Sequence, residues 1–326
     1  MSRASNEQTV AQIGEFGLIS AIAQRIGVAD PKIVPVGIGD DSAVITNSKS
    51  EIVACLDMLS EGVHFRNDWS TGKHVGLKAA AQNFADICAM GATPTSLLVG
   101  LAIPSTTTVE WVMDFFEGLL EEAAKVNAHI VGGDVVRSDT ITISVTALGE
   151  ILGDGPILRS GAKVHDVVAY AGKLGYSAAG LLCLNRGFRS PRALVNAHRC
   201  PEPPYEMARE ALQAHSMIDV SDGLIADLGH IAAASGVQIQ LDTDLIKVPA
   251  DLQEAAAAFG GDAMQWLLFG GEDHAFVATF PDALAVPNDW SIIGHVVPGE
   301  PSVLIDGQLH TGHGGHGWDH FAPEAN

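Results

Sequence analysis

The apolar positions in the first half of the chain change repeatedly between the spacing of a helix and that of a strand. At the start, apolar residues recur every three or four positions from Ile13 to Ile26 and predict a helix that ends near Gly27. Further helices are predicted at 74–90 and 109–126. Strands are predicted where apolar residues alternate or run on, at 42–46, 51–56, 96–103, just before Gly132 and at 140–149. This alternation indicates a sheet covered by helices.

A segment rich in glycine, proline and charge, LGDGPILRSGAKVHD at 152–166, interrupts this pattern and is typical of a linker. The alternation then resumes, with strands predicted at 167–171, 217–220, 237–241, 275–280 and 292–297, and helices at 177–185, 206–215, from 222 onward and near 250–269. With 326 residues the chain is long enough for two domains. We therefore predict an α/β (α+β) protein with domains at 1–151 and 152–326.

The charge balance narrows the range of partners. The chain has 39 acidic and 18 basic residues and a net charge of −21, which opposes binding to nucleic acid or to an anionic membrane surface. The same charge repels nucleotides and sugar phosphates. An anionic substrate would therefore need cations at its site, and Mg²⁺ is the natural candidate.

Neither a membrane-spanning segment nor export is indicated. Residues 88–109 carry no charge, but only Leu97–Ile103 is continuously apolar, which is too short to cross a bilayer. The N-terminal segment MSRASNEQTV lacks an apolar signal core, and the four cysteines form no CxxC pair. We expect reduced thiols and a cytoplasmic location.

Aspartate follows glycine or a small residue at the ends of several strand-like runs: GIGDD, ACLDM, VGGD, DVSDG and GGED. Such turns hold a carboxylate with little side chain in the way, and carboxylates are preferred ligands of hard metal ions. No P-loop, strand–GxGxxG–helix or protein-kinase signature accompanies them. A single Asp–Gly turn is weak evidence, because turns favour both residues for local reasons. If the chain binds a nucleotide, it must therefore do so through carboxylate-bound Mg²⁺.

Polar residues also interrupt the helix predicted at 74–90. Lys78, Gln82 and Asp86 recur every four positions, with Asn83 beside them, so one polar stripe runs along an alanine-rich helix. Such a stripe, taken alone, more often faces water than a site. His64, in EGVHF, could be structural or could donate to a phosphate. The histidines of the tail HTGHGGHGWDH favour a flexible loop over a metal site.

Taken in order, the motifs are more specific than any one of them. The chain contains, in this order, the motifs GIGDDSAV, DMLSEGVHF, KAAAQNFADICAMGATP, VGGDVVRS, LRSGAKVHD, GYSAAGLL, DVSDGLIADLGHI, GGEDH, IGHV and WDHF. In this order they resemble the signatures of the thiamine-monophosphate kinase family, and the resemblance extends from Gly14 to Phe321. The resemblance implies the two-domain fold of the aminoimidazole ribonucleotide synthetase superfamily. It also implies a homodimer joined through its N-terminal sheets, and ATP bound with several Mg²⁺ ions.

The resemblance assigns roles position by position. The Mg²⁺ ligands would be Asp40, Asp41, Asp57, Asp86, Asp134, Asp219 and Asp222, with backbone oxygen atoms at Cys55 and Leu56. The ATP contacts would be Gly133, Asp134, Arg159 and Ser221, and the acceptor contacts would be His64, Glu272 and Trp318. No covalent nucleophile or general base is expected.

Three departures from the family pattern affect individual contacts. Cys55-Leu56-Asp57 stands where the family usually has Ser-Thr-Asp, so a hydroxyl ligand is lost. GGDVVRS replaces GGDTTRS, and GGEDH replaces GGEDY. Two alternatives stay open: another kinase or synthetase of the same superfamily with a different small substrate, or a noncatalytic nucleotide-binding relative.

Overall fold

The structure is a computed structural model that describes residues 52–151 and 155–309, together with single positions between Gln12 and Ile33. It divides into two compact units, each of which is described by itself. The first comprises Met1–Ile87 and Ala92–Ile151, and the second comprises Cys88–Gly91 and Leu152–Asn326. No helix in the described ranges is long and apolar enough to cross a membrane.

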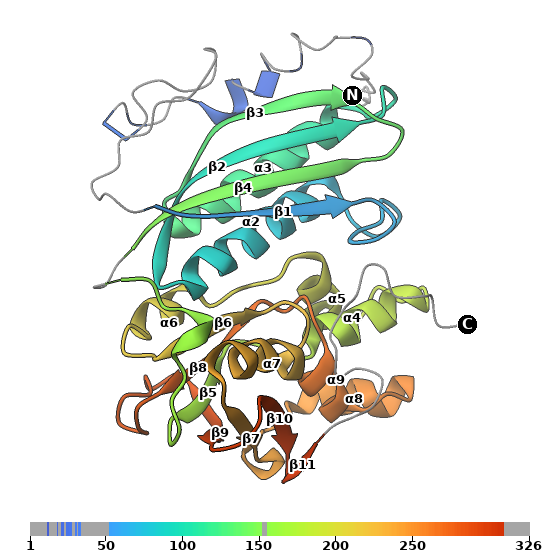
Figure 1. Ribbon diagram of the computed structural model, residues 1–326. Helices are drawn as coiled ribbons and strands as arrows, with labels where there is room; N and C mark the ends of the chain where they lie inside the picture. The colour runs from blue at the N-terminus through green and yellow to red at the C-terminus, as the bar shows by residue number, and fades with distance from the viewer. Residues whose placement is uncertain are drawn as a thin grey trace. The chain divides into compact units, whose positions relative to one another are not determined.

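The first unit contains a four-stranded sheet in the order β1-β4-β2-β3 (Figure 1). Its strands are β1 (Ile52–Ser60), β2 (Ala92–Ile103), β3 (His129–Arg137) and β4 (Thr142–Ile151). Only β2 and β3 are parallel, as a helix between them in sequence allows, and the other pairs are antiparallel. Along β4 each buried residue alternates with a half-buried one, so one face of the sheet is covered and the other is not.

Two helices, α2 (Gly72–Ala89) and α3 (Val109–Val126), lie on the covered face of this sheet (Figure 1). They cross so closely that side chains would not fit at the crossing. A Cβ atom on Gly76 would lie 2.0 Å from the carbonyl oxygen of Phe115, and one on Gly118 would lie 2.2 Å from that of Lys73. The bounds of α3 follow from its caps: the Thr108 side chain accepts the N–H of Trp111, and Asn127 adopts a left-handed conformation.

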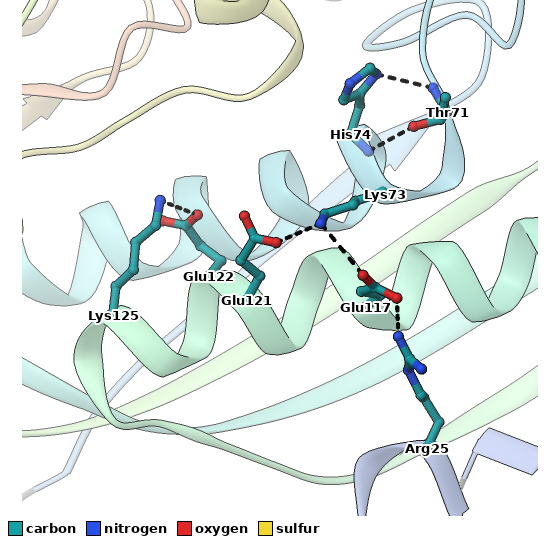
Figure 2. Close-up of polar contacts among 8 residues, drawn as sticks. All are labelled: Arg25, Thr71, Lys73, His74, Glu117, Glu121, Glu122 and Lys125. Atoms are coloured by element: carbon teal, nitrogen blue, oxygen red, sulfur yellow. Dashed lines mark hydrogen bonds and ion pairs between the residues drawn. The ribbon is translucent and has the colours of Figure 1, made fainter.

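Ion pairs join α2, α3 and the start of the chain (Figure 2). Lys73 of α2 contacts Glu121 at 2.6 Å and Glu117 at 3.5 Å, and Glu117 also pairs with Arg25. Arg25 belongs to a stretch whose described residues are helical up to Ile26. The predicted first helix therefore agrees with the described positions, and its apolar face includes the buried Leu18 and Ile22.

The second unit is built on a seven-stranded mixed sheet in the order β11-β10-β7-β9-β5-β8-β6. The strands are β5 (Val167–Ala171), β6 (Ser216–Val220), β7 (Gln238–Leu241), β8 (Ala275–Phe280), β9 (Ser291–Val297), β10 (Ser302–Ile305) and β11 (Gln308–Leu309). β6 and β8 are buried along their whole lengths and pair antiparallel, with Asp219 opposite Phe276. The ends of these two strands position most of the site in this unit.

The helices of the second unit are α4 (Tyr176–Asn185), α5 (Arg192–Arg199), α6 (Tyr205–Glu210), α7 (Leu224–Ser235), α8 (Ala250–Phe259) and α9 (Ala263–Phe269), with short 3-10 turns at Arg159–Gly161 and Thr243–Leu245. α7 contacts β6, β7 and β10 and contributes Leu224, Leu228 and Ile231 to the core. α4 packs against α5, α8 and α9.

Most predicted elements are present, but several predicted bounds were wrong. β1 continues past Asp57 to Ser60, because its pairing with β4 continues to Thr142. The Gly-Gly-Asp at 132–134 lies inside β3 and not after it. The helix predicted at 206–215 stops at Glu210, and the chain then enters the sheet as the N–H of His215 binds the carbonyl of Thr279. α5 and β10 were not predicted, and the strand predicted at 42–46 lies outside the described residues.

Candidate functional site

The edge strand β1 places Cys55 and Asp57 on one face and the exposed Leu56 and Met58 on the other, because successive side chains of a strand point to opposite faces. The Cys55 thiol donates to the backbone carbonyl of Asn83 in α2, at 3.3 Å. Burial raises the pKa of this thiol far above its ordinary value, and the charges of Asp86 and Asp57 raise it further. The thiol is therefore neutral, and it lies close to two carboxylates from different elements.

The polar stripe of α2 does not face water as a whole. Lys78 and Asn83 are buried, at 2% and 0% exposure, and Asp86 is half-buried beside Cys55. The Asn83 amide donates back to the carbonyl of Ala79 in the same helix. The stripe therefore faces the interior of the unit on the side of β1, and the solvent-facing interpretation is wrong for these positions.

His64 lies in the loop that follows β1 and is fixed at two points. The backbone N–H of Ser60 donates to its Nδ1 atom at 3.0 Å, and the Lys78 Nζ atom donates to its backbone carbonyl at 3.0 Å. A ring nitrogen that accepts a hydrogen bond carries no proton, so the neutral His64 ring carries its proton on Nε2. The ring is thus set up as a donor from Nε2.

Gly133 and Asp134 lie in the exposed part of β3. A Cβ atom on Gly133 would lie 2.0 Å from the carbonyl oxygen of Val99 in β2, so only glycine fits there. The Asp134 carboxylate accepts the N–H of Val135. A small cavity beside them is lined mostly by apolar side chains: Ile22, Ile26, Val99, Phe116, Ile130 and Val135, with Gly132, Gly133 and Asp134 at its polar side.

In the second unit, the loop after β6 and the loop before β8 are joined through their backbones. The N–H of Glu272 donates to the carbonyl of Ser221, and the N–H of His274 donates to that of Val220. Glu272 and His274 both have positive φ angles, 63° and 53°, which residues other than glycine rarely adopt. Strained backbone of this kind clusters at functional sites. The loops carrying DVSDG and GGEDH therefore form one structure.

Asp219 is buried at the end of β6, and its carboxylate lies 3.0 Å from Nδ1 of His274. Asp222 follows it in the loop, and its backbone N–H and that of Gly223 both donate to the Asp227 carboxylate. Burial and the charges of Asp219 and Asp222 raise the pKa of Asp227 to about 8. The charges of Asp219 and Asp222 therefore lie close enough to Asp227 to oppose its ionisation.

The other predicted residues of this unit lie around these loops. Glu272 contacts Nδ1 of His198 at 3.3 Å, and the same nitrogen lies 3.0 Å from the hydroxyl of Ser177. Arg159 is exposed, and its carbonyl accepts the hydroxyl of Ser235 at the end of α7. Ser221 is half-buried.

The donor sets fit hard divalent cations. In the first unit Asp57 and Asp86 converge on a neutral thiol, and in the second unit Asp219 and Asp222 lie close enough to raise the pKa of a third carboxyl. A bound cation would relieve this repulsion, and carboxylate oxygen atoms suit Mg²⁺. Ligand atoms of Asp222, Asp227 and His230 also lie within 4.8 Å of one another.

Within the first unit, the fold brings together Asp57, Asp86 and Cys55. Within the second unit, it brings together Asp219, Ser221, Asp222 and Glu272. Three predicted site residues, Asp40, Asp41 and Trp318, lie outside the described residues, as does the His-rich tail. Sequence reasoning missed Asp227, His230 and His198. The first two stand three apart on α7 within DVSDGLIADLGHI, so their shared helix face was the available signal.

Comparison with known proteins shows the family to which the chain belongs. The family model described as AIR synthase related protein, N-terminal domain, matches residues 39–151, and the corresponding C-terminal domain matches 163–307. A thiamine-monophosphate kinase of Mycobacterium tuberculosis (strain CDC 1551 / Oshkosh) is 44% identical over 100% of this chain and 97% of its own length. The kinase of the same name from Corynebacterium glutamicum is 39% identical over 96% of this chain and 95% of its own length.

Among solved structures, AaThiL complexed with AMPPCP and TMP has a TM-score of 0.79 and 32% identity, covering 95% of this chain and 98% of that chain. The same family is thus indicated by both family models, by relatives matched over nearly their whole length and by a similar solved structure. The chain belongs to the thiamine-monophosphate kinase family, within the AIR synthase related proteins.

Proposed function

We propose that this protein transfers the γ-phosphoryl group of ATP directly to thiamine monophosphate and releases thiamine diphosphate and ADP. The observation that carries the proposal is the match over 95% of the chain to a structure complexed with AMPPCP and TMP. The named activity of the 44% identical relative supports the same reaction. Two clusters of carboxylates, one in each unit, would supply the metal ligands that this reaction needs.

The acceptor requires no strong general base. A phosphate monoester has a second pKa of about 6, so its attacking oxygen is already anionic near neutral pH. The difficulty is repulsion between two anions: two unit charges 4 Å apart repel by about 1 kcal/mol in water, and two dianions by roughly four times as much. Positioning and charge neutralisation are therefore the main tasks of the site.

The carboxylates of Asp57, Asp86, Asp134, Asp219 and Asp222 would hold the Mg²⁺ ions, together with Asp40 and Asp41 and backbone carbonyls at Cys55 and Leu56. The neutral Cys55 thiol cannot serve as a thiolate ligand, so this segment would contribute only oxygen atoms. Among the strands that the structure describes, β1 lies at the edge of its sheet, so part of its backbone polar groups is not paired with β4. When bound, Mg²⁺ would supply positive charge that offsets the repulsion between the two phosphates.

The residues expected to contact ATP are Gly133, Asp134, Arg159 and Ser221. Gly133 and Asp134 lie beside the apolar cavity, whose lining by Ile22, Ile26 and Phe116 suits the flat face of a purine base. Arg159 would supply a fixed positive fork for phosphate oxygens, and Ser221 a hydroxyl. The three cavity residues extend the set that sequence motifs indicated.

The acceptor would be held at both ends. The Nε2–H group of His64 would donate to its phosphate, since the opposite nitrogen accepts the N–H of Ser60. At the other end the thiazolium ring is a permanent cation, which suits the Glu272 carboxylate and the aromatic face of Trp318. An acidic protein can thus bind an acceptor that carries both charges.

We also propose a homodimer joined through the uncovered face of the four-stranded sheet, and a cytoplasmic location. Leu56 and Met58 of β1 and Val136 of β3 are more than half exposed, at 57%, 54% and 51%. Exposed apolar residues grouped on one sheet face mark an interaction surface.

The experiment is product analysis with purified protein, ATP, Mg²⁺ and thiamine monophosphate. Thiamine diphosphate formed in equal amount to ADP supports the proposal. ADP release without thiamine diphosphate, or with another acceptor from a panel of small substrates, would assign the chain to a different reaction of the superfamily. Calorimetric binding of ATP and Mg²⁺ without turnover would indicate a noncatalytic relative.

A further inference from the structure

A buried lysine stands in the first unit without a role in the proposed reaction. The Lys78 side chain is 2% exposed, although lysine is almost never fully buried unless it is paired. Burying an ammonium group costs free energy that partners must offset. Its ammonium donates to the backbone carbonyl of His64 at 3.0 Å.

The loop that carries His64 is held from several sides. Phe65 is 2% exposed, so the residue after His64 is anchored in the core. The N–H of His64 donates to the carbonyl of Ser60, and the N–H of Ser60 donates to Nδ1 of the His64 ring. Lys78 holds the remaining backbone polar group, the carbonyl. Both backbone groups of His64 and one ring nitrogen are thus fixed by named partners.

This arrangement determines what the ring can do. Rotation of the His64 backbone would move Nδ1 away from the Ser60 N–H, and the ring could then carry its proton on either nitrogen. The bond from Lys78 opposes that rotation. With Nδ1 held as an acceptor, the proton lies on Nε2, and the ring acts as a directed neutral donor.

We propose that Lys78 is a positioning residue: by binding the carbonyl of His64 it keeps the imidazole in the Nε2–H tautomer that donates to the phosphate of the acceptor. The inference rests on the proposed function, because it takes the acceptor to be thiamine monophosphate. Lys78 itself acts through His64 and touches neither substrate.

The test compares Lys78→Met, which keeps the length of the side chain and removes its charge and donors, with Lys73→Met. Lys73 lies on the same helix and forms surface ion pairs with Glu117 and Glu121 (Figure 2), so it is the matched control. We expect K78M to raise the KM for thiamine monophosphate at least about tenfold, with the KM for ATP within about twofold of wild type. K73M should change neither, because a surface ion pair contributes little.

Two further measurements separate positioning from a general loss of structure. In protein labelled with ¹⁵N-histidine, the signals that disappear in His64→Gln identify His64. We expect an unprotonated Nδ1 and a protonated Nε2 in wild type, and a mixture of tautomers in K78M. In a His64→Ala background, K78M should no longer change the KM for thiamine monophosphate, because the two residues act in sequence.

The possible failures are distinct. Wild-type protein that forms no thiamine diphosphate overturns the proposed function, and with it the role of Lys78 in binding this acceptor. Active wild-type protein overturns the inference alone if K78M keeps its KM, or if K78M has the same effect with and without His64. If K78M does not fold, the wild-type spectrum still decides, because a His64 protonated on Nδ1 contradicts the proposal.

Discussion

The carboxylate of Asp273 accepts a 2.7 Å hydrogen bond from the backbone N–H of Ser177, 96 residues earlier in the chain. Its other oxygen accepts the N–H of Gly175 at 2.6 Å, so one buried carboxylate satisfies two orphan donors at the start of α4. Burial raises the pKa of Asp273 to about 7. This contact fixes the GGEDH loop, which carries Glu272, to the start of α4, which lies far earlier in the chain.

We predict that Asp273→Asn lowers the free energy of unfolding by about 2–3 kcal/mol at pH 8, where the native side chain is ionised. Asparagine offers one acceptor oxygen, so its amide group would face a backbone N–H that is left unsatisfied. Urea unfolding measures the change. Asp262→Asn is the control, because Asp262 caps α9 from an exposed position through a single oxygen, and Asn caps as well as Asp. Equal, small losses in both variants would contradict the prediction.

The raised pKa of Asp227 predicts how the free energy of unfolding depends on pH. Its folded-state pKa is raised to about 8, whereas an unfolded Asp titrates near about 3.9. Between these values the folded protein holds a proton that the unfolded chain releases, so raising the pH favours unfolding. In EDTA, the free energy of unfolding should therefore fall from about pH 4 to about pH 8. Each such group contributes up to about 1.4 kcal/mol per pH unit.

Asp227→Asn should make that slope shallower and leave the protein more stable than wild type at pH 8. One asparagine oxygen can still accept the N–H groups of Asp222 and Gly223, since both donate to the same carboxylate oxygen. Asp282→Asn is the control: Asp282 is exposed and accepts the N–H of Leu284 in a turn. A wild-type stability that rises over this pH range would show that the sign is wrong.

The sequence predicted those elements whose signals are local. The helix at 109–126 and the strand at 167–171 match α3 and β5, because a Thr cap and a left-handed Asn bound the helix and an uninterrupted apolar run fills the strand. α5 was missed because RALVNAHR is short and half of its residues are polar, and its helix follows from packing against α4. Propensity alone cannot supply that long-range contribution.

Prediction of the site from the sequence was also limited to local signals. The carboxylates were found because Asp beside Gly is visible in the sequence, but their partners depend on the fold. Nothing local indicates that Lys78 is buried, that the His64 ring accepts the N–H of Ser60, or that Glu272 has a positive φ. These features depend on how the elements pack, which a local pattern does not specify.

The crossing of α2 and α3 leads to a third prediction. Gly76→Ala should lower the free energy of unfolding by about 1–3 kcal/mol or more, because its Cβ would lie 2.0 Å from the carbonyl oxygen of Phe115 and the helices would have to separate. Gly229→Ala should instead stabilise by up to about 1 kcal/mol, since Gly229 lies within α7 and a Cβ there meets no atom within 4 Å. Urea unfolding compares the two, and a stabilised Gly76→Ala variant would refute the close crossing.

Asp86 gives the most direct test of the metal cluster. Asp86→Asn should reduce turnover at least about 100-fold while leaving the circular dichroism spectrum unchanged, because the change removes a charge beside Cys55 and Asp57 without changing side-chain shape. Asp139→Asn, at an exposed turn, should keep wild-type turnover. Calorimetry with Mg²⁺ and ATP provides a second measurement. Wild-type activity in Asp86→Asn would remove this residue from the cluster.

The uncovered sheet face determines the predicted oligomer. Leu56 and Met58 alternate with Cys55 and Asp57 on β1, so charge can be placed on the outer face without altering the inner one. We expect the double variant Leu56→Glu, Met58→Glu to be a folded monomer, because burying two carboxylates in an apolar interface costs more than the contact provides. Leu284→Glu is the control, at a side chain that is 97% exposed in the second unit. Sedimentation analysis should show a dimer for wild type and for the control. A wild-type monomer would overturn the predicted dimer, and a double variant that stays dimeric would place the interface elsewhere.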